Sequence, residues 1–346
     1  MPSKGKAPVD REVGPENEFY FQWHVTERCN RRCLHCYQST QRTKELSTPE
    51  LGKILTIMET ALAKWNRRGS ISFTGGEPFI RRTELIDLLE KVDKSAQFDF
   101  YDILTNGSLI DNELLILLKK ASKLRRVQVS LEGSTPTTND RLRGHGSFAE
   151  TMKAIKGLKQ CGFTVSVMTT VSRLNYRDIS NILDLLKQEG VDTFSVERLV
   201  PEGKGKQLKD QLLTASEVRD MFELLYKLKQ KSKTPRILTY RPLYCLVAPD
   251  DMHNGALCSV GNNALTIMPD GTVYPCRRLP IPIGNILEDG LFSIWYQSEV
   301  LWDIRNPANL KGKCGQCNLM THCRGCRAVA YAVTGDYLAE DPQCWN

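Results

Sequence analysis

The chain lacks any apolar stretch near the roughly 20 residues that a membrane-spanning helix requires, and its opening, MPSKGKAPVDREVGPEN, is polar. That opening has none of the apolar centre of a signal peptide. We therefore expect residues 1–17 to form a flexible N-terminal segment. We also expect a cytoplasmic location and no contact with a membrane.

The chain also lacks the composition of a nucleic-acid-binding surface. Its net charge of +7 is spread over separate basic runs, such as residues 204–209, without interleaved aromatic residues that could stack on bases. We expect no nucleic-acid partner. An acidic peptide, a carboxylate-rich small molecule or an acidic electron donor remains compatible with this charge.

Cysteine is too sparse for a secreted disulfide scaffold, with twelve in 346 residues. Ten of the twelve nevertheless fall in two clusters, one near the beginning of the chain and one in its C-terminal part. Clustered cysteines in a reducing compartment favour metal ligation over disulfides. The chemistry of the chain is therefore expected at these two clusters.

The first cluster has the spacing C-x3-C-x2-C and lies in WHVTERCNRRCLHCY, directly after a strand predicted at residues 21–25. Three thiolates on one loop suit a metal or an iron–sulfur cluster better than a disulfide, which would leave one cysteine over. If a four-iron cluster is held by Cys29, Cys33 and Cys36, one iron stays open for another ligand. Structural zinc is the alternative.

The following segment alternates predicted strands and helices. A hydroxyl, a proline and a glutamate at residues 47–50 begin the first helix, which Gly69 ends. Further strands are predicted at 70–73, 100–104, 126–131, 164–171 and 193–199, and further helices at 83–93, 112–122, 147–160, 176–188 and 215–231. Six strand–helix units predict a parallel α/β sheet with sites at the carboxyl ends of its strands. They are too few for a closed eight-stranded barrel.

The second strand is followed by Gly75, Gly76, Glu77 and Pro78. The glycines let the backbone bend and expose its polar groups, and the carboxylate can accept hydrogen bonds from an ammonium group. A glycine-rich turn with a helix-capping acid is the alternative. The sequence therefore indicates a binding site at this strand end.

The next two strands also end in polar residues. Asn106 follows the third strand, where a simple turn residue is the alternative. Ser130 and Glu132 end the fourth strand, and the two-residue period of a strand places both on one face. These side chains are predicted to face the same cleft.

The C-terminal part of the chain, which holds the second cysteine cluster, begins near residue 235, where helical periodicity gives way to short strands and turns. Pro269, Asp270 and Gly271 predict a β-hairpin between residues 264–268 and 272–274. Paired C-x2-C units favour metal, and zinc is the generic choice. Seven cysteines exceed one tetrahedral site and suit two clusters: Cys258, Cys276, Cys314, Cys317, Cys323, Cys326 and Cys344.

The N-terminal triad together with G-G-E-P resembles the radical SAM enzymes, and the C-terminal array resembles their SPASM domain. The resemblance implies a partial (β/α)6 TIM-like barrel at residues 18–234. A small SPASM domain with a β-hairpin and short helices would follow at 235–346. It also implies reductive cleavage of S-adenosylmethionine to a 5′-deoxyadenosyl radical, with the cofactor's amino and carboxylate groups chelating the open iron of a [4Fe–4S] cluster.

The resemblance further assigns roles at the SAM site. Residues 75–78 would contact the methionine amino group, and Ser130 and Glu132 the ribose and carboxylate. His35 stands where the family has an aromatic ring against adenine; metal ligation by His35 is the alternative. Asp140 and Arg143, in TNDRLRG, resemble a loop over the active site, and a plain surface pair is the alternative.

In the SPASM arrangement, Cys258, Cys276 and Cys326 would hold a first auxiliary [4Fe–4S] cluster. A second would be held by Cys314, Cys317, Cys323 and Cys344. Two departures from the family pattern stand out. The last spacing within the quartet is x2 instead of x3, and no cysteine shortly follows Cys258 as a fourth ligand. Cys245 is the candidate for that position.

The function predicted from this resemblance is hydrogen abstraction from a ribosomally made peptide during oxidative cross-linking. A low-potential flavodoxin-type or ferredoxin-type donor would supply electrons. No leader-recognition domain fits within the first twenty residues, so a separate leader-binding protein or direct docking is expected. Two alternatives remain, a haem or haem d1 pathway enzyme and a non-catalytic zinc-binding module.

Overall fold

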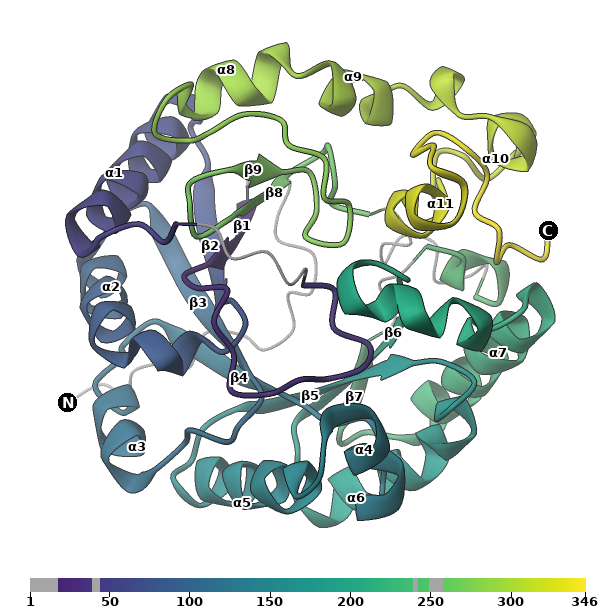
Figure 1. The fold of residues 1–346 in the computed structure, drawn as a ribbon, viewed down its shortest axis with the longest axis horizontal. Helices are drawn as coiled ribbons and strands as arrows, with labels where there is room; N and C mark the ends of the chain where they lie inside the picture. Colours follow the sequence, from purple (N-terminus) through teal and green to yellow (C-terminus); the bar gives the residue numbers. More distant parts are fainter. Residues whose placement is uncertain (1–17, 39–43, 239–241, 249–257) are drawn as a thin grey trace.

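A single nine-stranded sheet forms the centre of the molecule in the computed structural model, in the order β7-β6-β5-β4-β3-β2-β1-β8-β9. The sheet curves into an open ring with helices around its outside (Figure 1). The structure describes residues 18–38, 44–238, 242–248 and 258–346. The segment at residues 1–17, predicted to be flexible, therefore lies outside the described residues.

All six predicted strand–helix units are present, and the partial-barrel fold is confirmed. The strands are β1 Glu18–His24, β2 Arg68–Thr74, β3 Phe98–Thr105, β4 Leu124–Ser130, β5 Val165–Val171, β6 Thr193–Arg198, β7 Arg236–Leu238, β8 Ala264–Ile267 and β9 Val273–Tyr274. The helices are α1 Thr48–Trp65, α2 Arg82–Lys94, α3 Asn112–Leu118, α4 Pro136–Arg143, α5 Ser147–Gln160, α6 Ile179–Gln188, α7 Ala215–Lys231, α8 Gly290–Gln297, α9 Glu299–Arg305, α10 Gly312–Gln316 and α11 Arg327–Thr334.

The predicted hairpin exists as β8 and β9, and it extends the barrel sheet. Strand β8 pairs in parallel with β1, from Tyr20 opposite Ala264 to Trp23 opposite Ile267. This pairing covers an edge of β1 whose backbone groups would otherwise lack a strand partner. The short strand β7, which the sequence did not indicate, extends the opposite edge beside β6. The sheet thus continues beyond residue 234.

Two local predictions were wrong. Helix α1 ends at Trp65, because Asn66 adopts a left-handed conformation and caps it, while Gly69 lies inside β2. The segment predicted as a loop around Asp140 and Arg143 is helix α4. Its N-terminus is set by the Thr135 side chain, which accepts a hydrogen bond from a backbone N–H, and by a proline in the first turn.

The C-terminal segment is joined to the barrel by a buried ion pair. Arg198, the last residue of β6, donates to Asp341 at 2.8 Å and to Gln343 at 2.9 Å. All three side chains are buried. The same Asp341 carboxylate accepts from the backbone N–H of Cys326 at 2.8 Å. The end of β6 and the cysteine-rich segment are therefore fixed to each other.

The two faces of the sheet differ in chemistry. Phe19, Phe21 and Trp23 of β1 are fully buried in the apolar core between sheet and helices. The alternate residues point into the ring and include polar groups, such as Glu18, which accepts a hydrogen bond from Ser70. Within the described ranges, no helix combines the length and the apolar character needed to cross a bilayer.

A charged cluster inside the ring joins β3 to β4. Asp102 is 2% exposed and accepts hydrogen bonds from Arg125 at 2.9 Å and from Arg126 at 3.0 Å. Burial alone would raise the pKa of Asp102, but the two guanidinium groups outweigh it and lower the pKa. The carboxylate is thus held in its charged form between two arginines.

We predict that Asp102→Asn lowers the free energy of unfolding by roughly 3 kcal/mol, because it removes the charge that two largely buried guanidinium groups share. Urea denaturation at neutral pH measures the change. Since the pKa is lowered on folding, the contribution of Asp102 is complete above the ordinary Asp pKa of about 4 and declines as the pH falls below it. The difference in free energy of unfolding between variant and wild type should therefore shrink as the pH falls below about 4.

Asp99→Asn is the matched control, because Asp99 pairs with Arg68 at an exposed site on the same strand. It should cost less than about 1 kcal/mol. Equal effects of the two substitutions would contradict the role assigned to Asp102.

Candidate active site

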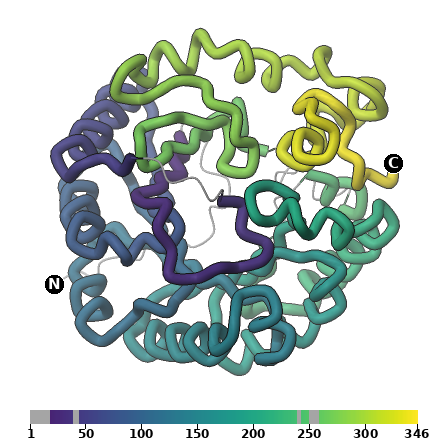
Figure 2. The backbone as a smooth tube through the Cα atoms, viewed as in Figure 1, coloured from purple at the N-terminus to yellow at the C-terminus, as the bar shows by residue number. Residues whose placement is uncertain are grey.

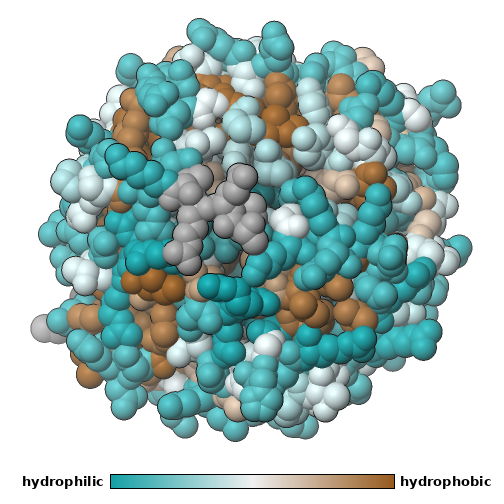
Figure 3. Space-filling view, viewed as in Figure 1, coloured by the Kyte–Doolittle hydropathy of each residue, from teal (hydrophilic) through white to brown (hydrophobic). Residues whose placement is uncertain are grey.

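The cysteine triad lies on the segment that follows β1, at the carboxyl ends of the parallel strands. In Figure 2 this segment passes across the opening of the ring. The coloured surface around the opening is mainly hydrophilic, with hydrophobic residues in separate patches (Figure 3). Cysteine thiols, glycines and polar strand ends thus gather at the end of the sheet where sites in such folds occur.

The glycine pair holds this segment against β2. The N–H of Gly76 donates to the carbonyl of Thr26 at 2.9 Å, and the N–H of Glu77 donates to the carbonyl of Arg28 at 2.9 Å. A Cβ atom at Gly75 would lie 2.4 Å from the Thr26 oxygen, and one at Gly76 2.3 Å from the Arg28 oxygen. Only glycine permits this approach of two backbones.

The Glu77 carboxylate is fully buried and joins the ends of β2 and β3. It accepts hydrogen bonds from the Thr105 hydroxyl and the Asn106 N–H, both at 2.8 Å, and from the N–H of Phe79 at 3.2 Å. Burial raises the pKa of Glu77 to about 7 despite these bonds. The predicted contact with an ammonium group stays a prediction, and Pro78 begins the short 3-10 helix Pro78–Arg81.

Asn106 contacts the cysteine segment directly. Its side-chain amide donates to Asn30 at 3.0 Å and lies 3.9 Å from the Cys29 sulfur. Asn106 is therefore more than a turn residue, because its side chain positions the segment that carries Cys29. Ser130, the last residue of β4, is half-buried near the same end of the sheet.

A buried charge network lies beside the triad. Glu132 accepts from Arg143 at 2.8 Å, and the His35 Nε2 atom lies 3.4 Å from its other oxygen. Burial would raise the pKa of Glu132, but Arg143 and His35 lower it to about 2. The Arg143 Nε and His35 Nδ1 atoms are buried, and neither has a hydrogen-bond partner among the described residues. These two polar groups fit a cofactor with a carboxylate and hydroxyl groups, such as SAM.

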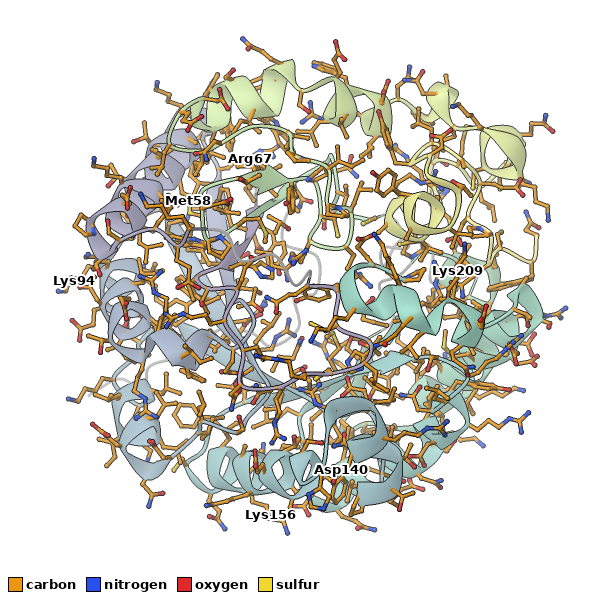
Figure 4. All side chains as sticks on the ribbon, in the orientation of Figure 1. Met58, Arg67, Lys94, Asp140, Lys156 and Lys209 are labelled. Atoms are coloured by element: carbon orange, nitrogen blue, oxygen red, sulfur yellow. The ribbon has the colours of Figure 1, made fainter. Side chains whose placement is uncertain are left out.

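Asp140 does not share this site. Its carboxylate accepts from the N–H groups of Gly146 and Phe148 and from the Ser147 hydroxyl, at 2.7 to 2.8 Å. Figure 4 shows Asp140 near α4 and α5, away from the centre of the ring. Asp140 therefore fixes the beginning of α5, while Arg143 on the same helix faces Glu132.

The thiols of the triad are neighbours without meeting at one point. Burial and the neighbouring Glu132, Cys36 and Cys29 groups raise the pKa of Cys33 to about 11, against the opposing charge of Arg143. Among the described residues, no three His, Cys, Asp or Glu side chains are placed to hold a single metal ion. In an iron–sulfur cluster each cysteine binds a different iron, so spread sulfur atoms fit this donor set.

The C-terminal cysteines form two groups. The Cys258 thiol lies within electrostatic range of Cys276 and Cys326. The other group surrounds a cavity of about 30 Å³ whose lining includes Cys314, Cys317, Cys323 and Cys344. The structure therefore brings the cysteines of each set near one another, and the donors of each suit an iron–sulfur cluster. Their assignment as ligands of two clusters stays a prediction.

Cys245 does not lie where we expected. It was the candidate fourth ligand beside Cys258, but its thiol lies within electrostatic range of Cys323 and Cys317. The backbone N–H of Leu243, two residues earlier, donates to the Cys323 sulfur at 3.2 Å. The fold brings residues 242–248 to the second group, which sequence spacing could not reveal.

The sequence also missed polar residues on the inner wall next to the triad. His24, the last residue of β1, is fully buried, and neither ring nitrogen has a hydrogen-bond partner within the described part of the chain. The Arg277 guanidinium lies 4.7 Å from the centre of the Tyr37 ring and pairs with Glu27 at 4.0 Å, while its Nε atom lacks a hydrogen-bond partner in the same part of the chain. Arg278 pairs with Glu197 at 2.9 Å. The sequence could have indicated two of these residues only by their position, because Tyr37 directly follows Cys36 and Arg277 directly follows Cys276.

Comparison with known proteins agrees with this geometry. Residues 23–186 match the family model of the radical SAM superfamily, and residues 258–327 match that of the SPASM iron–sulfur cluster-binding domain. The chain is 31% identical over 342 residues to the AdoMet-dependent heme synthase of Methanosarcina barkeri, covering 93% of this chain and 95% of that protein. It is 32% identical over 350 residues to the mycofactocin maturase MftC of Mycolicibacterium smegmatis, covering 96% and 84%.

The fold is shared with SuiB of Streptococcus suis bound to S-adenosylmethionine, with a TM-score of 0.76, 20% identity, and coverage of 96% of this chain and 78% of that one. The chain thus belongs to the radical SAM superfamily of enzymes. Within it, the C-terminal match places the chain among the members with a SPASM domain. Iron–sulfur clusters and SAM binding follow from these two domains.

We predict that Gly76→Ala displaces the triad segment, because the new methyl group would overlap the Arg28 carbonyl. Iron bound after anaerobic reconstitution should fall, and SAM binding should weaken by more than about tenfold. Gly157→Ala in α5 is the control, since its Cβ would meet only Leu115 at an ordinary 3.6 Å. Wild-type iron content and SAM affinity in Gly76→Ala would disprove the role of the close approach.

Proposed function

We propose that this enzyme abstracts a hydrogen atom from a ribosomally made peptide and promotes its oxidative cross-linking. The observation that supports radical chemistry here is the convergence of the triad segment, the glycine pair and the Glu132–Arg143 pair at one end of the sheet. A [4Fe–4S] cluster on Cys29, Cys33 and Cys36, with SAM, would supply the one-electron chemistry that yields the deoxyadenosyl radical. A flavodoxin-type or ferredoxin-type protein would donate the electron.

The side chains around the triad would bind and orient SAM. The unpartnered Nε atom of Arg143 can donate to the methionine carboxylate, while Glu132 keeps that guanidinium in place. His35 would lie against the adenine. Residues 75–78 and Ser130 would complete the contacts to the amino group and the ribose. The largely polar ring behind them would hold the substrate near the 5′ carbon and exclude water.

We predict that Cys33→Ala abolishes formation of 5′-deoxyadenosine by the reduced protein, because the cluster would lose one of its three protein ligands. Liquid chromatography of a reaction with dithionite and SAM measures the product. Cys161→Ala is the control, since Cys161 lies at the end of α5 outside the cysteine groups. Deoxyadenosine formation at the wild-type rate in Cys33→Ala would refute the assignment of the triad.

The peptide substrate is supported by the similarity to the mycofactocin maturase MftC across 96% of this chain. The fold is also shared with SuiB bound to its precursor peptide SuiA, at 19% identity and a TM-score of 0.76. A separate leader-binding protein or direct docking of the leader would bring such a peptide to the opening of the ring. The two auxiliary clusters would accept an electron from the substrate radical.

An iron porphyrin is the second candidate substrate. The similarity to the heme synthase of M. barkeri extends over 95% of that protein. The buried His24 ring and the buried Arg277 Nε atom, which have no hydrogen-bond partner among the described residues, also suit a ligand with carboxylates, because a guanidinium group binds carboxylates well. The non-catalytic zinc-binding module has no comparable support.

One experiment separates the two substrates. The reduced enzyme is incubated with SAM and either Fe-coproporphyrin III or synthetic peptides encoded by short reading frames beside its gene. We expect a peptide to raise deoxyadenosine formation above the rate without substrate and to lose hydrogen atoms by mass spectrometry. Stimulation by the porphyrin, with loss of carbon dioxide or hydrogen from it, would replace the peptide proposal by the porphyrin one.

A further inference from the structure

The 3-10 segment η3, Gly203–Gln211, lies directly against the segment that carries the cysteine triad. The Gly205 N–H donates to the carbonyl of Cys36 at 3.0 Å, and the Lys204 N–H donates to the carbonyl of Gln38 at 3.2 Å. The Gln207 side-chain amide donates to the Leu34 carbonyl at 3.1 Å. In Figure 2 the two segments lie side by side at the opening of the ring. These hydrogen bonds fix η3 to the residues around the third cysteine of the triad.

A second close backbone contact holds η3 in this place. Gly203 has a φ of 56°, and a Cβ atom there would lie 2.4 Å from the carbonyl oxygen of Tyr37. Only glycine avoids that overlap. The two segments therefore form one preorganised surface, because neither can shift without breaking this contact.

The surface formed by these two segments is strongly basic. Residues 28–36 and 203–211 contain three arginines and three lysines, against a single acidic residue, Asp210. Arg28 and Arg31 pair with neighbouring glutamates of other segments. The remaining basic side chains are available to carboxylates of a partner.

The available basic side chains surround an exposed apolar residue. Arg32, Lys206 and Lys209 are exposed. Lys206 pairs with Glu202 at 3.0 Å, but its side chain stays 66% exposed, and such surface pairs contribute little to stability. Leu34, whose carbonyl Gln207 contacts, is 36% exposed. A polar, charged rim around an apolar centre is typical of a surface that binds another protein.

We propose that Arg32, Leu34, Lys206 and Lys209 form the docking surface for the acidic electron-transfer protein that reduces the triad cluster. This inference rests on the proposed function, because it requires a [4Fe–4S] cluster on the triad. One electron leaves the docked protein, which is oxidised, and reduces the cluster. Leu34 lies between the second and third cysteines of the triad, so a protein in contact with it sits next to the cluster.

Charge and position favour this partner over the substrate. A basic face steers an acidic protein toward it and raises the rate of association. The substrate must reach the 5′ carbon inside the ring, whereas these side chains are exposed to solvent. Figure 4 shows Lys209 away from the centre of the ring.

The test compares full-length wild type, reconstituted without oxygen, with the double variant Lys206→Glu/Lys209→Glu. Formation of 5′-deoxyadenosine from SAM is measured with subsaturating reduced flavodoxin or ferredoxin, and separately with dithionite. With a protein donor at low salt, we expect the initial rate of the variant to fall by about tenfold or more. This difference should shrink at high salt, because salt screens exposed charges. The rate with dithionite should be unchanged, because neither lysine belongs to the SAM site.

Lys94→Glu/Lys156→Glu is the matched control, because it changes the net charge equally at exposed sites. Figure 4 shows both lysines at the outer edge of the molecule, on α2 and α5. The control should keep the wild-type rate with every reductant. Equal losses in the two double variants, or no loss in Lys206→Glu/Lys209→Glu, would overturn the inference. So would an equal loss with dithionite, because the substitutions would then have damaged the SAM site.

Three further outcomes separate this inference from the proposed function. If a peptide raises the dithionite-driven rate of wild type but not of Lys206→Glu/Lys209→Glu, the surface binds peptide and the inference is wrong. Wild type that forms deoxyadenosine with dithionite but with neither protein donor would overturn the inference alone. Wild type that forms none with dithionite would refute the proposed function, and the inference with it.

Discussion

The close contact between two backbones at Gly75 and Gly76 is the constraint on which the active end of the barrel depends. The N–H groups of Gly76 and Glu77 donate to carbonyls of the segment after β1 at normal distances only because neither glycine has a side chain that would separate the two backbones. That contact sets the height of the cysteine segment above the sheet. Glu77 connects this segment to the neighbouring strand, because its carboxylate accepts hydrogen bonds from Thr105 and Asn106 at the end of β3. The Asn106 side chain in turn lies beside Cys29.

The buried charges serve a similar purpose in two different places. Inside the ring, Asp102 joins neighbouring strands, and at the rim Arg198 joins β6 to Asp341 of the C-terminal segment. An isolated charge in such surroundings would be strongly unfavourable, so each partner specifies where the other must lie. By contrast, Arg143, Arg277 and His24 each keep at least one buried polar atom that no described residue satisfies, and a ligand could bind at these atoms.

The sequence predicted the regular elements well where apolar periodicity was strong. Helices α5 and α7 have the predicted bounds, because each presents one apolar face. Helix α4 was missed, since its polar segment TNDRLRG has no apolar stripe and its beginning depends on a threonine cap and a proline. The six strands were predicted from their composition, whereas the three-residue strand β7 exists only because β6 offers an edge.

At the site, local spacing pointed to the triad, the glycine pair and the C-terminal cysteines, while the division of those cysteines into two groups came from the resemblance to the SPASM domain. It could not place Cys245, whose neighbours are far along the chain, nor show that Asp140 faces α5 while Arg143 faces Glu132. His24 carried no signal other than its place before the cysteine segment. Contacts between distant segments are set by tertiary packing, and a single sequence records them only where a family pattern is known.

The parallel pairing of β1 with β8 has a consequence for electron transfer. One strand leads directly into the triad, and the other leads through a tight turn to Cys276, so a shared ladder of backbone hydrogen bonds fixes the spacing between these cysteines. If both bind the proposed clusters, the sheet would set the distance that an electron crosses between them. The sheet would hold this distance constant during the reaction.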